Sequence, residues 1–250
     1  TEVRFTGGEP LLRRGLVDIV HRVNALPAEP HTSLTTNGIG LAKIAPALAE
    51  AGLDRVNVSL DTLDRQRFID LARRDRLDDV LAGLEEATSA GLEPVKINAV
   101  LLRGVNDDEA VRLLRFALDH GYQLRFIEQM PLDAQHGWDR RTMVTADEIL
   151  ESLSAAYDLT PVDPGLRGSA PAEDWLVDGG PASVGVIASV TRPFCGSCDR
   201  VRLTADGQLR NCLFAREESD LRTALRSGAS DEELATRMRA AMLVKRAGHG

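Results

Sequence analysis

Short apolar stretches alternate with longer amphipathic stretches along the first half of the chain. The apolar stretches have the length and the Val, Ile and Thr content of strands, and they lie at residues 2–6, 31–36, 54–60, 94–102 and 123–130. The stretches between them carry apolar residues at helical spacing, at residues 15–26, 41–51, 64–90 and 107–120. Strands separated by helices in this way predict an α/β fold, with a curved or closed parallel sheet and helices outside it.

The alternation ends near residue 131. Beyond it come a loop, a helical segment, a Pro- and Gly-rich connection, two β-like segments and two helices. The loop covers residues 132–141, the helical segment residues 145–157 and the Pro- and Gly-rich connection residues 161–174. The β-like segments are residues 174–177 and 183–190, and the two helices are residues 217–227 and 231–245. The change of pattern predicts two domains, a barrel-like domain at residues 1–145 and a β-rich C-terminal module at residues 146–250.

Composition narrows the classes of function. The chain has 250 residues, of which 43% are hydrophobic, so it can bury a substantial core. Its formal net charge of −8 argues against general binding to nucleic acid or to a membrane surface. No apolar run approaches the roughly 18 residues of a membrane-spanning helix, and no signal peptide opens the chain. We expect a cytoplasmic protein that meets anions through local clusters of Arg or Lys.

All three cysteines, Cys195, Cys198 and Cys212, surround one predicted β-hairpin. Structural zinc sites take four ligands and disulfide scaffolds use even numbers of cysteines, so three thiols need another explanation. An iron–sulfur cluster with one iron open to a non-protein ligand fits such a tripod. Two alternatives stay open, namely three ordinary buried thiols and a zinc site whose fourth ligand comes from elsewhere.

The hairpin that carries the third cysteine has two possible registers. With a two-residue loop at Asp206-Gly207, Cys212 faces Val201. With a three-residue loop, Gly207 takes the left-handed position and Cys212 faces Arg200 instead. We favour the second register because it gathers the guanidinium groups on the side of the thiolates. The arginines concerned are Arg200, Arg202 and Arg210.

Glycine and polar residues gather where the predicted strands end. In a βα barrel, ligands bind at the C-terminal ends of the strands. Gly7 and Gly8 permit close backbone approach, and Glu9 offers a carboxylate to an ammonium group. An ordinary strand-to-helix turn explains the glycines as well, and a methionine at a strand end is also typical of core packing. The other candidates at such ends are Thr35, Thr36, Asn37, Ser59 and Met130.

Two cations interrupt predicted strands. A strand that is buried on both faces is expected to be apolar throughout, yet residues 95–100 contain Lys96. A buried lysine needs an anion, so Lys96 is a candidate for binding a charged ligand. Arg125 is a comparable candidate, and an ion pair with Glu128 or another barrel carboxylate is the internal alternative.

Several of these motifs occur together in one known family. "TGGEP" follows the first strand, "TTNG" follows the second, "VSLD" ends the third, and a Cys-x2-Cys-x13-Cys pattern runs into "DRVRLTADG". Together they resemble the radical S-adenosylmethionine enzymes that act as GTP 3',8-cyclases in molybdenum cofactor biosynthesis. The resemblance covers nearly the whole chain. "GGEP" alone would indicate only the superfamily, whereas the three-cysteine motif with its arginines narrows the match.

The resemblance implies a fold and a set of cofactors. Family members hold two [4Fe-4S] clusters on three cysteines each, one binding S-adenosylmethionine and the other facing GTP. Cys195, Cys198 and Cys212 would then hold the second cluster, with the substrate at its open iron. The first cluster's Cys-x3-Cys-x2-Cys loop and the family's Gly-Gly tail do not occur here. We therefore expect a fragment, a partial (β/α)6 TIM-like barrel without its first βα unit, that does not cleave S-adenosylmethionine alone.

The resemblance also implies binding residues. Those expected to bind S-adenosylmethionine are Gly7, Gly8, Glu9, Asn37, Ser59 and Met130. Those expected to bind GTP are Arg4, Thr35, Lys96, Arg125, Arg200 and Arg202. For Arg4, an ion pair within the barrel is the internal alternative, with Asp61 as a candidate partner.

The implied reaction converts GTP to (8S)-3',8-cyclo-7,8-dihydroguanosine 5'-triphosphate through a 5'-deoxyadenosyl radical. It requires an electron donor, and a second copy of the chain is a candidate partner. Two other functions compete with this interpretation. One is a radical S-adenosylmethionine enzyme that modifies peptides and carries an auxiliary cluster. The other is a non-catalytic binding module stabilised by zinc.

Overall fold

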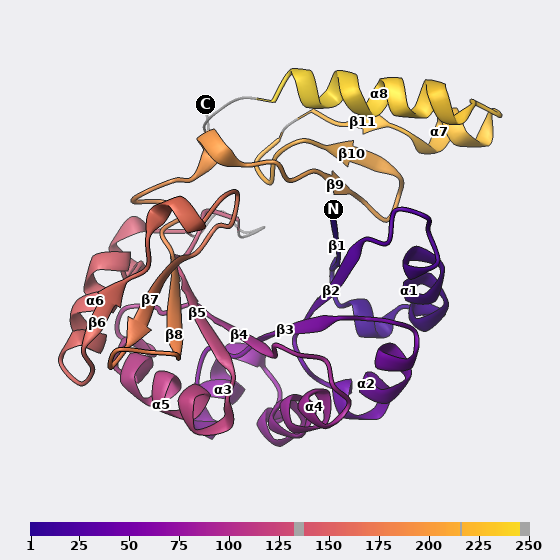
Figure 1. Ribbon diagram of the computed structural model, residues 1–250. Helices are drawn as coiled ribbons and strands as arrows, with labels where there is room; N and C mark the ends of the chain where they lie inside the picture. The colour runs from indigo at the N-terminus through magenta and orange to yellow at the C-terminus, as the bar shows by residue number, and fades with distance from the viewer. Residues whose placement is uncertain (133–137, 216, 246–250) are drawn as a thin grey trace. The chain divides into compact units, whose positions relative to one another are not determined.

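The computed structural model describes residues 1–132, 138–215 and 217–245, and the chain divides into two compact units (Figure 1). The first unit comprises Thr1–Arg167 and Ala172–Arg192, and the second comprises Gly168–Pro171 and Pro193–Gly250. The chain therefore does not divide at the expected boundary between residues 145 and 146. The physical reason is that strands beyond residue 145 pair with the sheet of the first unit.

One eight-stranded sheet organises the first unit, in the order β1-β2-β3-β4-β5-β8-β7-β6. Its strands are β1 (Glu2–Phe5), β2 (His31–Thr36), β3 (Arg55–Ser59), β4 (Lys96–Ala99), β5 (Gln123–Ile127), β6 (Leu159–Pro161), β7 (Glu173–Val177) and β8 (Ser183–Ile187). Strands β1 to β5 and β8 are parallel, and β6 and β7 add an antiparallel edge. The expected α/β partial barrel is confirmed, and β8 supplies a sixth parallel strand that we had placed in the C-terminal module.

Helices cover the outer side of this curved sheet (Figure 1). They are α1 (Leu16–Asn24), α2 (Leu41–Glu50), α3 (Arg65–Ala72), α4 (Leu77–Ser89), α5 (Ala110–His120) and α6 (Ala146–Ser154). A capping box begins α6, because Thr145 and Glu148 exchange hydrogen bonds between side chain and backbone. The capping box gives a hydrogen-bond partner to a backbone N–H group at the start of α6 that has none within the helix.

The helix predicted over residues 64–90 is in fact two helices. Asp64 caps α3 by accepting a hydrogen bond from the backbone N–H of Arg67. Arg73 then ends α3 in the left-handed conformation, with φ of 59°. The apolar spacing continues across the charged residues between α3 and α4, so the sequence pattern did not show where α3 ends.

The two faces of the parallel sheet differ in polarity. Side chains alternate along a strand, and those on the helix side of β2 to β5 are buried and mostly apolar, as in Leu34, Val56, Val58, Ile97 and Phe126. The residues between them point to the other face and are mostly polar. The main core of the first unit therefore lies between the sheet and the helices, and the inner face of the sheet is left for polar side chains.

The second unit holds a small antiparallel sheet in the order β11-β10-β9 and two helices. Its elements are β9 (Arg202–Leu203), β10 (Gln208–Arg210), β11 (Ser219–Asp220), α7 (Arg222–Arg226) and α8 (Asp231–Leu243). The helix expected from residue 217 begins only after β11. The expected β-rich module with helices is present, although its core is small: its buried apolar side chains, among the described residues, are Leu209, Ala224 and Ala241.

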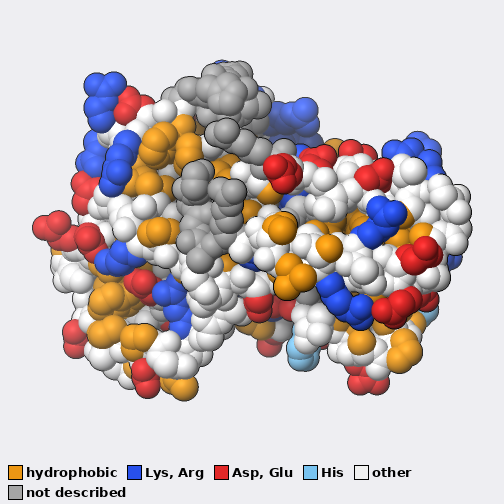
Figure 2. Space-filling view, turned by 90° about the horizontal axis from the view of Figure 1, so that it is seen from above, with side chains coloured by type: hydrophobic (Ala, Val, Ile, Leu, Met, Phe, Trp, Pro, Cys, Tyr) orange, Lys and Arg blue, Asp and Glu red, His pale blue; other side chains and the backbone are white. Residues whose placement is uncertain are grey.

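Charged side chains of both signs are interspersed over the face of the molecule seen in Figure 2. Within the residues that the structure describes, no helix is long and apolar enough to cross a membrane.

Candidate functional site

The inner face of the parallel sheet is lined with polar side chains. On β3, Arg55, Asn57 and Ser59 alternate with two buried valines, and on β4 Lys96 and Asn98 alternate with Ile97 and Ala99. The departure of β4 from an all-apolar pattern, noted in the sequence, therefore has a structural reason. Lys96 belongs to a face that is polar on several neighbouring strands.

Four cations share this inner face. Arg4, Arg55, Lys96 and Arg125 come from β1, β3, β4 and β5. Burial, together with the charges of Arg125, Arg55 and Arg4, lowers the pKa of Lys96 to about 8, while Asp174 opposes them. Burial likewise lowers the pKa of Arg125, with Arg4 and Arg55 acting in the same direction. These side chains repel one another, which favours an anion as ligand.

Glu2 joins two of the cations. Its Oε1 atom accepts hydrogen bonds from Nη2 of Arg4 at 2.9 Å, from Nη2 of Arg55 at 2.7 Å and from Oγ of Ser33 at 3.1 Å. Burial alone would raise the pKa of Glu2, but the two guanidinium groups hold it below its usual range. Sequence reasoning missed both Glu2 and Arg55, although Arg55 shares its strand face with the predicted Ser59.

An ion pair within the barrel is confirmed for Arg4, but the carboxylates named for Arg4 and Arg125, Asp61 and Glu128, accept hydrogen bonds from other groups. Arg4 pairs with Glu2, whereas Asp61 accepts the backbone N–H of Val100 at 2.8 Å. Burial raises the pKa of Asp61, so this carboxyl is a poor counter-ion for Arg4.

Glu128 does not neutralise Arg125 but connects segments. It is fully buried and accepts the backbone N–H groups of Ala146, Val190 and Thr191, each at 2.8 Å. Glu128 therefore attaches the start of α6 and the segment after β8 to the end of β5. The carboxylate that acts on Arg125 instead is Asp174 of β7.

The loops after β1 and β2 are joined through Glu9. Its carboxylate accepts a hydrogen bond from Oγ1 of Thr36 at 2.7 Å, from the backbone N–H of Asn37 at 2.8 Å and from that of Leu11 at 3.0 Å. Glu9 therefore shapes both loops, in addition to any contact with a ligand. Gly7 has a φ of 146°, and a Cβ at Gly7 or Gly8 would meet nothing within 4 Å, which leaves room beside this backbone.

The remaining candidates of the first unit lie at different depths. Thr35 is half-buried and accepts a hydrogen bond from Nδ2 of Asn57 at 3.3 Å, on the same inner face as Lys96. Ser59 is exposed at the C-terminal end of β3, and Met130 is half-buried beyond the end of β5. The side chain of Asn37 accepts the backbone N–H of Ile39 at 2.9 Å, which closes a turn.

The three cysteines of the second unit carry half-buried thiol groups. Cys195 begins one turn of 3-10 helix and Cys198 follows its end, and Cys212 comes after β10. Burial raises the pKa of Cys195, and so do the charges of Cys212 and Cys198, which places the three thiols within electrostatic reach of one another. Their proximity is what a shared metal cluster requires.

Cys198 is held in a basic environment. Arg200 donates to its Sγ from Nε at 3.3 Å and from Nη2 at 3.2 Å, and Nζ of Lys245 lies 3.4 Å from the same atom. Burial would raise the pKa of Cys198, but these donors hold it below its usual value. Because the thiolate is the form that binds metals, this donor set fits an iron–sulfur cluster.

Among the described residues, no group of three or more His, Cys, Asp or Glu side chains converges as ligands of a single metal ion. A zinc site requires every thiolate within about 2.3 Å of one point. In a [4Fe-4S] cluster each cysteine binds a different iron, so the sulfurs stand further apart. The result for the described residues therefore bears on a site for a single metal ion, and it does not test a [4Fe-4S] cluster.

The hairpin adopts the register that we favoured. Arg202 pairs with Arg210 and Leu203 pairs with Leu209, so the loop spans three residues and ends at Gly207, which has a φ of 81°. Arg200 and Cys212 lie beyond the paired residues of β9 and β10, so their pairing stays a prediction. The guanidinium of Arg200 also lies 4.6 Å from the ring centroid of Phe194, which fixes its orientation.

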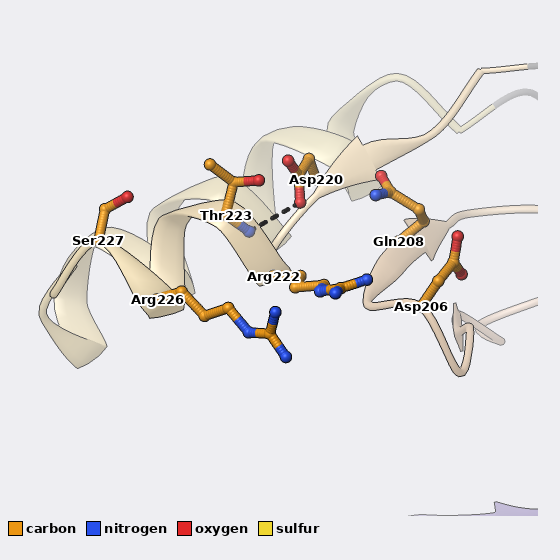
Figure 3. Close-up of a pocket in the computed structure, with 7 residues that line it drawn as sticks. All are labelled: Asp206, Gln208, Asp220, Arg222, Thr223, Arg226 and Ser227. Atoms are coloured by element: carbon orange, nitrogen blue, oxygen red, sulfur yellow. Dashed lines mark hydrogen bonds between the residues drawn. The ribbon is translucent and has the colours of Figure 1, made fainter.

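A polar pocket of about 400 Å³ lies beside this hairpin (Figure 3). Its lining residues are Asp206, Gln208, Asp220, Arg222, Thr223, Arg226 and Ser227. Asp220 accepts the backbone N–H of Thr223 at 3.0 Å, so its carboxylate caps α7. None of the predicted site residues lines this pocket.

Two family models match this chain, one over its N-terminal half and one over its C-terminal half. Residues 1–117 match the Radical SAM superfamily, and residues 122–250 match the family described as Molybdenum Cofactor Synthesis C. GTP 3',8-cyclase from Streptomyces coelicolor is 67% identical over 100% of this chain and 73% of its own length. The enzyme of that name from Mycobacterium sp. strain KMS is 62% identical over 100% of this chain and 71% of its own length. The chain belongs to the GTP 3',8-cyclase family.

Membership confirms the resemblance that the motifs indicated. It also implies, for the Radical SAM superfamily in general, an iron–sulfur cluster and S-adenosylmethionine. Among solved structures, TYW1 with a lysine-pyruvate adduct bound aligns at 19% identity over 65% of this chain and 53% of its own, with a TM-score of 0.49. That likeness adds nothing to the family assignment.

Proposed function

We propose that this chain carries the GTP-binding and cyclising machinery of a GTP 3',8-cyclase. The product is (8S)-3',8-cyclo-7,8-dihydroguanosine 5'-triphosphate, an intermediate of molybdenum cofactor biosynthesis. S-adenosylmethionine with its cluster supplies, when bound, the 5'-deoxyadenosyl radical that removes the ribose 3' hydrogen so that C3' bonds to guanine C8. The observation that carries the proposal is the gathering of four cations on the inner face of the sheet.

The cations hold the substrate's triphosphate. Arg4, Lys96 and Arg125 repel one another in the free chain, and a polyanion removes that repulsion. Thr35 adds a hydroxyl group on the same face. Arg200 and Arg202 stay predicted GTP ligands of the second unit. Holding both reacting carbons of one nucleotide in place is the protein's main contribution, because the radical chemistry belongs to the cofactor.

Cys195, Cys198 and Cys212 are proposed to hold a [4Fe-4S] cluster with one iron open to the substrate. The effect of Cys198 and Cys212 on the ionisation of Cys195, and the stabilisation of the Cys198 thiolate by Arg200 and Lys245, support this assignment. The cluster that binds S-adenosylmethionine takes its ligands from cysteines other than these three.

S-adenosylmethionine is proposed to bind where β1 to β5 end. The residues concerned are Gly7, Gly8, Glu9, Asn37, Ser59 and Met130. The open space beside the two glycines supports this place, and Glu9 acts by fixing the loops on which the glycines and Asn37 lie. An electron donor, a second copy of the chain as partner and a cytoplasmic location stay predictions.

Metal and sulfide analysis of anaerobically reconstituted protein tests the cluster. The three cysteines should bind about four iron and four sulfide per chain, and replacing all three with Ala should abolish this binding. One zinc and no sulfide would support the zinc-stabilised module instead. Arg200→Ala and Arg202→Ala should both weaken GTP binding, and Arg202→Ala should do so without changing the iron content, which a peptide-modifying enzyme would not show.

A further inference from the structure

Arg55 is the cation of the inner face that neither a motif nor the family resemblance indicated. Its side chain is 16% exposed, and it lies in register with Ser33 of β2, which is in register with Arg4 of β1. The three residues therefore form one row across three neighbouring parallel strands. Arg55 and Arg4 flank Ser33 and point to the same face.

Glu2 fixes the two arginines relative to each other. One of its carboxylate oxygens accepts a hydrogen bond from Nη2 of Arg4 at 2.9 Å and from Nη2 of Arg55 at 2.7 Å. Nε of Arg4 in turn donates to Oγ of Ser33 at 3.3 Å, and that hydroxyl donates to Glu2. Each guanidinium has five N–H donors, so one shared oxygen accepts only part of their capacity.

The charges on this face do not balance. Arg4, Arg55, Lys96 and Arg125 carry four positive charges, and the carboxylates that act on them are Glu2 and Asp174. A purely structural ion pair would match one arginine with one carboxylate. Two arginines on one carboxylate instead leave a positive excess that suits a polyanion.

We propose that Arg55 is a further triphosphate-binding residue and that Glu2 is a positioning residue, which aligns the guanidinium of Arg55 with that of Arg4. The planar fork of an arginine binds phosphate oxygens in pairs, and two aligned forks hold two phosphate groups in fixed register. This inference deepens the proposed function and rests on it. The ligand chemistry is that of a nucleoside triphosphate.

Calorimetric titration of the anaerobically reconstituted chain with GTP and with inorganic triphosphate tests the role of Arg55. Arg55→Met removes the charge and keeps an unbranched stem, so both ligands should bind roughly tenfold to a hundredfold more weakly. Arg55→Lys keeps the charge without the fork and should give an intermediate loss. Arg115→Met, on the exposed side of α5, is the matched control and should leave both affinities unchanged.

The role of Glu2 is tested in the same titrations. Glu2→Ala removes the carboxylate that holds both arginines, and it should lower the affinity for both ligands several-fold. Glu2→Gln should restore most of the affinity, because an amide oxygen still accepts both donors. If Glu2→Ala instead strengthens binding, Glu2 competes with phosphate and does not position Arg55.

Other outcomes separate this inference from the proposed function. If the unmodified chain binds GTP and Arg55→Met binds it equally well, the inference alone fails. If the unmodified chain binds neither ligand, the proposed function fails with it. Far-ultraviolet circular dichroism and the thermal midpoint show whether each variant is folded. Should Arg55→Met not fold, weaker binding by a folded Arg55→Lys carries the test, and unchanged binding by Arg55→Lys overturns the inference.

Discussion

Lys96 has the most strongly perturbed charge on the inner face, and this makes substrate binding depend on pH. Burial and the charges of Arg125, Arg55 and Arg4, opposed by Asp174, place its pKa at about 8 in the free chain. A bound triphosphate stabilises the ammonium form and raises that pKa. Below about pH 8 Lys96 is already charged, whereas above it binding must also take up a proton.

The affinity for GTP is therefore expected to fall as the pH rises from 8 to 9, by up to about tenfold per pH unit. Calorimetric titrations at pH 7, 8 and 9 measure this change. Lys96→Met should bind more weakly at pH 7 and should lose the additional decrease above pH 8. An identical pH profile in the unmodified chain and in Lys96→Met would contradict the assignment.

Before the structure was known, three of the four cations on the inner face were candidates, and the omission of the fourth, Arg55, has a physical cause. Lys96 and Arg125 were found because each charge stood out from an apolar surrounding. Arg55 was missed because it opens its strand beside Asp54, where a charge resembles a loop residue. The alternation of Arg55, Asn57 and Ser59 with valines was the signal that could have revealed it.

Among the elements, the contact between α2 and α4 depends on two glycines. A Cβ at Gly83 of α4 would lie 2.9 Å from the backbone oxygen of Gly38 and 3.1 Å from Cβ of Leu41. Gly38 itself has a φ of 81°, and a Cβ there would lie 2.9 Å from a methyl carbon of Val58. The backbone of Gly38 therefore has little freedom to move away from α4.

Gly83→Ala sets two effects against each other. Alanine is favoured over glycine inside a helix by about 1 kcal/mol, whereas overpacking against fixed backbone costs about 1–3 kcal/mol. Because the closest atom is a backbone oxygen, we expect the packing cost to be larger and the free energy of unfolding to fall. Urea denaturation measures the change, with Ser89→Ala at the exposed end of α4 as control. A gain in stability would show that the helices separate easily.

The elements that sequence reasoning misjudged are those decided by distant contacts. The hairpin register followed from local turn chemistry at Gly207, and it was correct. Strand β6 and strand β11 were missed because each is two or three residues long and forms only by pairing with a partner strand. Strand β8 was recognised as a strand, but its pairing with β5 depends on a contact that no local pattern records.

At the scale of the whole molecule, the two units differ in how much apolar surface they bury. The large buried core of the described residues belongs to the first unit, whereas the second buries Leu209, Ala224 and Ala241. The second unit also exposes several large apolar side chains. They are Val201, Leu203, Leu225, Met238, Leu243 and Val244. A unit with so small a core needs another source of stability, which metal ligation supplies in small domains.

Removal of the cluster is therefore expected to loosen the second unit selectively. Amide hydrogen exchange of the reconstituted chain, compared with the chain treated with a chelator, should show faster exchange in residues 193–245 and little change in β1 to β5. Uniform loss of protection in both units would contradict this expectation. Unchanged exchange throughout would show that the second unit is stable on its own.

The separation between the two faces of the first unit's sheet has an evolutionary consequence. The helix side carries the packing that keeps the strands together, and the opposite side carries charges and amides that contribute little to that packing. Substitutions on the charged side can therefore change which molecule is accepted at small thermodynamic cost. A lineage could explore new substrates on such a scaffold while its melting temperature hardly moves.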